Sequence, residues 1–89
     1  MYYIIVYDLK SIKKRKSPNI LKILRKYLHW VQNSVFEGEL SLGIFHSLLI
    51  ELQTKIRTID CIIIYQIENQ NSVTKNILGI EKNSTNNFI

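Results

Sequence analysis

The first strand-forming run, residues 2–7, constrains the fold more than any other stretch of this chain. Its sequence is Tyr-Tyr-Ile-Ile-Val-Tyr, and an unbroken series of aromatic and β-branched residues favours a β-strand. A run that is apolar at every position is typical of a strand covered on both faces. Asp8 follows directly, and aspartate is disfavoured inside strands, so we expect it where the sheet ends and a loop begins.

The length of 89 residues limits the chain to one domain with a thin core. Association with a second copy would therefore add to its stability. No apolar run approaches the roughly 18 residues of a membrane helix, and the N-terminus has no signal-peptide pattern. The single cysteine, Cys61, excludes an internal disulfide, so we expect a cytoplasmic protein without a membrane segment. Because Cys61 begins an isoleucine run, we predict that it is buried in the core.

The net charge of +5 is concentrated in one basic segment, residues 10–26. This segment contains no acid and holds most of the chain's 12 basic residues: Lys10, Lys13, Lys14, Arg15, Lys16, Lys22, Arg25 and Lys26. Such a block indicates a polyanionic partner, most simply nucleic acid, whereas a merely solvated surface usually interleaves acids. The candidate nucleic-acid-binding residues are Lys10, Lys13, Lys14, Arg15, Lys16 and Arg25. Asp8 stands immediately before the segment, so it either has a functional role or only pairs with a lysine or caps the loop.

Two segments have helical periodicity. In the first, Ser17 is a suitable N-cap and Pro18 a suitable first residue, and the apolar stripe comprises Ile20, Leu24, Tyr27 and Leu28. The second runs from Ser41 to about Ile56, and its stripe comprises Phe45, Leu48, Leu49, Leu52 and Ile56. His46 falls off that stripe, so we expect it in solvent.

The remaining segments are predicted to be extended. Residues 29–40 form either one long bent strand or a strand folded tightly on itself, with Gly38 at a bulge or bend. After a turn at residues 58–60, a second strong apolar strand is expected at 61–67, and a last weak strand at 73–80. This order predicts an α+β, ferredoxin-like fold, with two helices packed on one face of an antiparallel sheet. Residues 1–80 would form this domain, and residues 81–89 a disordered tail.

A known protein family has a similar arrangement of motifs. After a first strand ending in Tyr7-Asp8 and a basic helix, residues 31–40 are Val-Gln-Asn-Ser-Val-Phe-Glu-Gly-Glu-Leu. This pattern resembles the small CRISPR-associated endonuclease family that partners the integrase in spacer acquisition. The Gln-x-Ser-Val-Phe-Glu-Gly stretch is the specific part, and the similarity covers residues 1 to about 80.

The resemblance implies a ferredoxin-like homodimer whose last strand, here near residues 75–80, joins the partner's sheet. It also implies that Asp8 is the catalytic carboxylate that binds a divalent metal, Mg²⁺ or Mn²⁺, facing its symmetry mate across the dimer. The implied activity is metal-dependent hydrolysis of RNA or DNA in antiviral defence. Where the family often carries further acids after the first strand, this chain has Lys10, Ser11, Lys13 and Lys14.

Two functions therefore remain open. The first is a metal-dependent endonuclease that uses Asp8 in a dimer. The second is a non-catalytic DNA-holding adaptor for the integrase, in which Asp8 is structural and the basic segment binds the duplex backbone. No general base accompanies Asp8 in the sequence, and Tyr7, with an unperturbed pKa of about 10, is a poor candidate at neutral pH. A generic RNA-binding domain ranks below both because the aromatic-glycine signature is absent.

Overall fold

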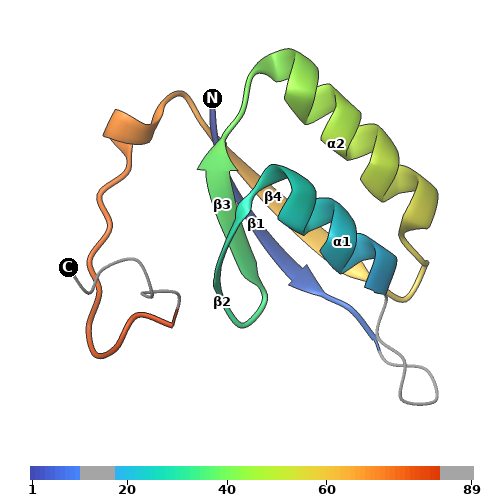
Figure 1. Cartoon of the computed structure of the whole chain (residues 1–89), viewed down its shortest axis with the longest axis horizontal. Coiled ribbons are helices and arrows are strands. Elements are labelled where there is room, and N and C mark those ends of the chain that lie inside the picture. Colours follow the sequence, from blue (N-terminus) through green and yellow to red (C-terminus); the bar gives the residue numbers. More distant parts are fainter. Residues whose placement is uncertain (11–17, 83–89) are drawn as a thin grey trace.

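The computed structural model describes residues 1–10 and 18–82 (Figure 1). In chain order its elements are β1 (Tyr2–Asp8), α1 (Pro18–Tyr27), β2 (His29–Gln32), β3 (Val35–Glu39), α2 (Leu42–Lys55), β4 (Cys61–Ile67) and a short 3₁₀ turn (Gln70–Ser72). The strands form one antiparallel sheet in the order β2-β3-β1-β4. Both helices pack on one face of this sheet, which confirms the predicted ferredoxin-like architecture.

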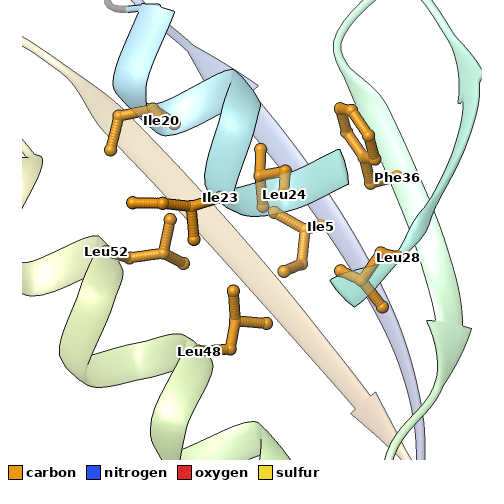
Figure 2. Packing of buried hydrophobic residues seen from close by; sticks show 8 residues of the cluster. All are labelled: Ile5, Ile20, Ile23, Leu24, Leu28, Phe36, Leu48 and Leu52. Carbon is orange, nitrogen blue, oxygen red and sulfur yellow. The ribbon is translucent and has the colours of Figure 1, made fainter. Parts of the chain in front are cut away.

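The core lies between this helix face of the sheet and the two helices. Ile5 of β1 is flanked by Phe36 of β3 and Ile64 of β4. Figure 2 shows the side chains that converge on it from both helices and the neighbouring strand: Ile20, Ile23, Leu24, Leu28, Phe36, Leu48 and Leu52. All of these are buried, and each contributes about 1.5–3 kcal/mol through apolar burial. The predicted helical stripes therefore supply most of the core, but Ile56, the last residue of the second stripe, is exposed.

The opposite face of the sheet, the open face, is covered by neither α1 nor α2. Strand alternation gives this face the even-numbered residues of β1, among them Ile4 and Val6, whose neighbours on β4 are Tyr65 and Ile63. Ile63 is 47% exposed and Tyr65 is 54% exposed. The second cover that the apolar run of β1 predicts thus comes from neither helix.

Residues 29–40 fold tightly on themselves as the β2–β3 hairpin, which decides between the two predicted arrangements. Asn33 makes the turn with a φ of 42°, a left-handed conformation that asparagine tolerates. The irregularity in the ladder lies between Trp30 and Gln32, so the prediction of a bulge at Gly38 is wrong. Gly38 pairs regularly with Tyr3. A Cβ at Gly38 would lie 2.9 Å from Leu28 Cδ2, so a larger residue there would force the buried Leu28 side chain to shift.

The second helix begins and ends as predicted. Ser41 is its N-cap and accepts a hydrogen bond from the Ile44 amide at 3.2 Å, while Ile56 is the C-cap. His46 is exposed, as expected. The first helix begins at Pro18, but its proposed cap, Ser17, lies outside the described residues.

The prediction that Cys61 is buried is wrong. The thiol is exposed because Cys61 begins β4 and shares the open face with Ile63 and Tyr65. Its neighbour Ile62, on the alternate side of the strand, packs against the core. The isoleucine run therefore predicted a strand correctly, but it did not indicate which face of that strand is buried.

The weak strand predicted at residues 73–80 is absent from the described part of the chain. Residues 73–82 are irregular, and Figure 1 shows this segment, in orange to red, running beside β2 and β3. Lys75 Nζ lies 2.5 Å from Glu37 Oε2 of β3, but no backbone ladder forms. A strand needs a sheet edge to pair with, and this segment pairs with none of the four described strands.

Two predictions concern the end of the chain and membranes. Residues 83–89 lie outside the described residues, so the disordered tail stays a prediction. Within residues 1–10 and 18–82, no helix combines the length and apolar composition that crossing a bilayer requires.

Candidate metal-binding carboxylate and nucleic-acid interface

Asp8 is an accessible carboxylate at an ordered strand end. It is the last residue of β1 and pairs across the ladder with Cys61, yet its side chain is 69% exposed. Its Oδ2 lies 3.4 Å from Lys10 Nζ, which is itself 60% exposed. Such an exposed pair contributes at most about 1 kcal/mol, so Lys10 is a weak competitor for a second cation at Asp8.

A hollow of about 340 Å³ adjoins Asp8 at the end of the sheet. Tyr7, Leu21 and the hairpin turn at Asn33 and Ser34 line it. The turn is held in place because the Asn33 carbonyl accepts hydrogen bonds from the Tyr7 hydroxyl and from Trp30 Nε1, both at 3.1 Å. The Tyr7 amide also donates to the Ser34 carbonyl at 3.0 Å. The hollow thus has a rigid wall beside the carboxylate.

Tyr7 does not supply a general base here. Burial raises the pKa of its hydroxyl, and the nearby Arg25 opposes this effect more weakly. The phenol is therefore neutral at physiological pH, and its proton is used to hold the Asn33 carbonyl. This agrees with the poor candidacy that the sequence analysis assigned to it.

The structure describes two of the six predicted nucleic-acid-binding residues. Lys10 lies just beyond β1 beside Asp8, and Arg25 is exposed on α1, near Tyr7. Lys22 and Lys26, from the same basic segment, are also exposed on α1. The other four candidates lie outside the described residues: Lys13, Lys14, Arg15 and Lys16.

An ionic cluster close to Asp8 was not predicted from the sequence, where Asp60 was placed only in a turn. The Asp60 side chain has no solvent exposure. Its Oδ1 accepts hydrogen bonds from Lys10 N at 3.1 Å and Arg57 Nη2 at 2.8 Å, and its Oδ2 accepts from Arg57 N at 3.1 Å and Arg57 Nε at 2.9 Å. Hydrogen bonds from Arg57 lower the pKa of Asp60 to about 2, although burial opposes the shift. An Arg-x-x-Asp spacing between a helix and a strand was the available signal.

A second polar set joins the two helices away from Asp8. Glu51 of α2 accepts hydrogen bonds from Lys26 Nζ at 2.6 Å and from the Tyr27 hydroxyl. These two hydrogen bonds, that from Lys26 first, lower the pKa of the Glu51 carboxyl group. Lys26 is therefore paired with an acid of α2, whereas the sequence placed it only within the basic segment.

The metal-ligand inventory around Asp8 is small. Among residues 1–10 and 18–82, no group of three or more His, Cys, Asp or Glu side chains is arranged to hold a metal ion. Mg²⁺ is commonly bound through one or two carboxylates together with substrate phosphates and water. A single Asp8 could therefore supply only some of the ligands of a divalent cation. A second carboxylate or a phosphate would complete the coordination.

The fold defines the class as a small ferredoxin-like α+β domain, and comparison with known proteins identifies the family. The model of the family "CRISPR associated protein Cas2" matches residues 1–75. The chain therefore belongs to the Cas2 family of CRISPR-associated proteins, as its motifs predicted.

Named relatives match nearly the whole chain. The CRISPR-associated endoribonuclease Cas2 3 of Thermodesulfovibrio yellowstonii is 40% identical over 89 residues, covering 99% of this chain and 98% of the relative. The CRISPR-associated endoribonuclease Cas2 of Thermotoga maritima is 43% identical over 83 residues, covering 92% of each chain. These relatives are thus similar in length as well as in sequence.

Solved structures share the fold. A crystal structure of Cas2 superposes with a TM-score of 0.80 at 35% identity, covering 93% of this chain and 91% of that one. Cas2 of Streptococcus pyogenes superposes with a TM-score of 0.69 at 25% identity, covering 89% of this chain and all (100%) of that one. The ferredoxin-like assignment thus rests on both the topology and these structures.

Proposed function

We propose that this Cas2 family member is a metal-dependent endonuclease that hydrolyses RNA or DNA as a homodimer. Its place would be the spacer-acquisition complex of antiviral defence, beside the CRISPR integrase. The observation that carries the proposal is Asp8, an exposed carboxylate fixed at the end of the central strand, beside a hollow and at the start of the basic segment. The relatives' description as endoribonucleases supports the same activity.

The proposed metal is Mg²⁺ or Mn²⁺, held by Asp8. When bound, such a cation supplies charge neutralisation at the scissile phosphate. Asp8 would orient the cation, while Lys10 and the basic residues after it would hold neighbouring phosphates on the strand being cut. Tyr7 would keep the wall of the hollow rigid through its bond to the Asn33 carbonyl.

The homodimer is supported by the open face. Ile63 and Tyr65 leave a largely apolar surface there, on the same side of β1 as Asp8. Burial of this surface against a second copy would supply the cover that the apolar run of β1 indicates. Packing about a two-fold axis would also bring a second Asp8 to the site and complete the sparse ligand set.

The segment after β4 also supports association. Its apolar side chains are exposed, with Ile77 at 49%, Leu78 at 97% and Ile80 at 86%. No strand in the described part of this chain pairs with them, whereas β2 and β4 each leave one sheet edge unpaired there. Pairing of residues 75–80 with a partner's sheet edge would cover these exposed side chains and also provide the unpaired edge strand with backbone hydrogen bonds.

A second candidate function is the non-catalytic DNA-holding adaptor. The observation that favours it is the pairing of Asp8 with Lys10, in a described region with no cluster of metal-binding side chains. In that case Asp8 would orient Lys10, and the basic segment would hold the DNA backbone while the integrase does the chemistry.

Substitution of Asp8 by asparagine separates the two functions. We expect Asp8→Asn to lower Mg²⁺- or Mn²⁺-dependent cleavage at least about 100-fold, because the cation loses its protein ligand. The dimer mass, melting temperature and metal-free nucleic-acid binding should stay close to wild type. The matched control is Glu68→Gln, an exposed acid just after β4 at the opposite end of that strand. Full activity in Asp8→Asn, or no cleavage by purified wild type with either metal, would favour the adaptor.

A further inference from the structure

The buried cluster around Asp60 links two segments that lie far apart in the sequence. Arg57 and Asp60 belong to the connection between α2 and β4, and Lys10 follows β1. Figure 1 shows the end of β1 and the beginning of β4 at the same end of the sheet. We call Asp60, Arg57 and the Lys10 backbone the Asp60 clamp. A buried carboxylate is tolerated only when its oxygens are well paired, and four N–H donors pair with this one.

The clamp holds both backbone polar groups of Lys10. Its amide donates to Asp60 Oδ1 at 3.1 Å, and its carbonyl accepts from Arg57 Nη2 at 2.5 Å. The pairing between β1 and β4 ends at Asp8 and Cys61. The clamp therefore fixes the chain two residues beyond the last ladder pair.

A purely local role would not need these contacts. Arg57 and Asp60 are three residues apart, and their side chains and the Arg57 amide already close the connection before β4. The bonds to Lys10 complete the pairing of the Asp60 carboxylate, and they also tie this connection to the chain that follows β1. They act on Lys10, which is itself the first of the predicted phosphate-binding residues and lies two positions after Asp8, where the basic segment leaves the sheet.

We infer that Asp60 and Arg57 are positioning residues, which hold Lys10 so that Asp8 and the start of the basic segment meet one nucleic-acid backbone in a fixed relation. This inference rests on the proposed function, because it assigns the clamp to the same site. Neither residue would touch the substrate. The partner engaged through this geometry is a phosphodiester backbone, bound without reading its base sequence.

The test compares two acid-to-amide substitutions. Asp60→Asn replaces one acceptor oxygen of the clamp with a donor, so the Lys10 amide or the Arg57 guanidinium loses its partner. Glu51→Gln is the matched control, because it also removes one negative charge from a carboxylate with two side-chain partners, Lys26 and Tyr27. Each substitution removes one negative charge from a basic protein, so long-range electrostatic attraction alone predicts that both variants bind nucleic acid as tightly as wild type or more tightly. If only Asp60→Asn binds more weakly, the cause is therefore that Lys10 is no longer held in place.

The first measurement needs no activity. Hydrogen exchange should become about tenfold or more faster at the Lys10 amide in Asp60→Asn. The Tyr7 amide, which donates to the Ser34 carbonyl, is the internal reference and should be unchanged. If the Lys10 amide of Asp60→Asn exchanges at the wild-type rate, Asp60 does not hold Lys10 and the inference is overturned.

The second measurement is binding of a short mixed-sequence DNA duplex without metal, over a range of salt concentrations. Asp60→Asn should bind more weakly, with a log–log salt slope that is smaller by about 0.9, the loss of one phosphate contact. The third is cleavage per folded molecule at saturating metal, where we expect kcat to fall about tenfold with a smaller change in KM. Arg57→Lys keeps the charge but not the planar fork, and it should shift all three readouts in the same direction. It also replaces Asp60→Asn if that variant does not fold.

The outcomes distinguish this inference from the proposed function. If wild type binds DNA but does not cleave it, the nuclease proposal fails, and the binding measurement still decides the role of the clamp. Faster Lys10 exchange with wild-type salt slope and wild-type kcat would show that the clamp only stabilises the fold. A wild-type protein that neither binds nor cleaves would overturn both.

Discussion

The two sides of β1 differ in how far the chain itself encloses them. On the helix face, Tyr3 and Ile5 have 0% exposure, and Tyr3 stacks on Phe45 of α2 with ring centroids 4.1 Å apart. On the open face, Tyr2 is buried, Ile4 and Val6 are partly buried, and Asp8 is exposed. One strand thus carries a closed core on one side, whereas its other side becomes more accessible from Tyr2 towards Asp8.

The difference shows that, in this small domain, the residues that stabilise the fold and the residues available for association lie on opposite faces of the sheet. The helix face receives its cover from α1 and α2, so its side chains report on folding of a single chain. The open face holds exposed isoleucine and tyrosine together with the accessible Asp8, so its side chains report on what the chain associates with. Substitutions on the two faces should therefore have different signatures in solution.

The largest expected effect belongs to the helix face. Leu24→Ala should lower the free energy of unfolding by about 2–5 kcal/mol, because the removed methyl groups leave a cavity between α1 and the sheet. Leu24 has 0% exposure. Chemical denaturation monitored by circular dichroism measures this loss. The control is Ile50→Ala on the outer side of α2, where the side chain is 58% exposed and the cost should be within about 0.5 kcal/mol. Equal costs at the two positions would remove the distinction between enclosed and open surfaces.

The next effect belongs to the open face. Ile63→Lys should dissociate the proposed dimer at micromolar concentration while leaving the circular dichroism spectrum of the folded chain unchanged, since a buried unpaired lysine opposes association. Light scattering over a concentration series measures the mass.

Its matched control is again at Ile50, which lies away from the open face. Ile50→Lys introduces the same charge at an exposed isoleucine of α2 and should keep the wild-type mass. A monomeric wild type, or an Ile63→Lys protein that stays dimeric, would contradict association through the open face.

Sequence patterns predicted the helix face better than the open face. The two helices, the strands predicted at residues 2–7 and 61–67 and the Ser41 cap are local signals, and the structure contains all of them. Cys61 and residues 73–80 were mispredicted because an apolar or β-prone stretch does not say which neighbour will cover it. That information lies in packing between segments distant in the chain.

The site shows the same limit. The position of Asp8 at a strand end followed from propensity alone, and the structure bears this out. Its ligand role stays a prediction. The Asp60 clamp could not be found in this way, because its decisive bonds join Lys10 to residues 47 and 50 positions later. No periodicity connects those segments; only the register of β1 against β4 does.

The smallest expected effect compares the enclosed acid, Asp60, with the open acid, Asp8. Hydrogen bonds from Arg57 lower the pKa of Asp60 from 3.8 to about 2 in the folded chain. The unfolded chain therefore binds this proton more readily, so Asp60 stabilises the fold above its unfolded pKa, and this contribution is lost as the pH falls from about 4 towards 2. Wild type should lose more of its melting temperature over that interval than Asp60→Asn does. Asp8→Asn keeps the clamp and should retain the Asp60 contribution. Parallel acid-melting curves for wild type and Asp60→Asn would mean that the clamp does not form in solution, and the contrast between the two acids would then disappear.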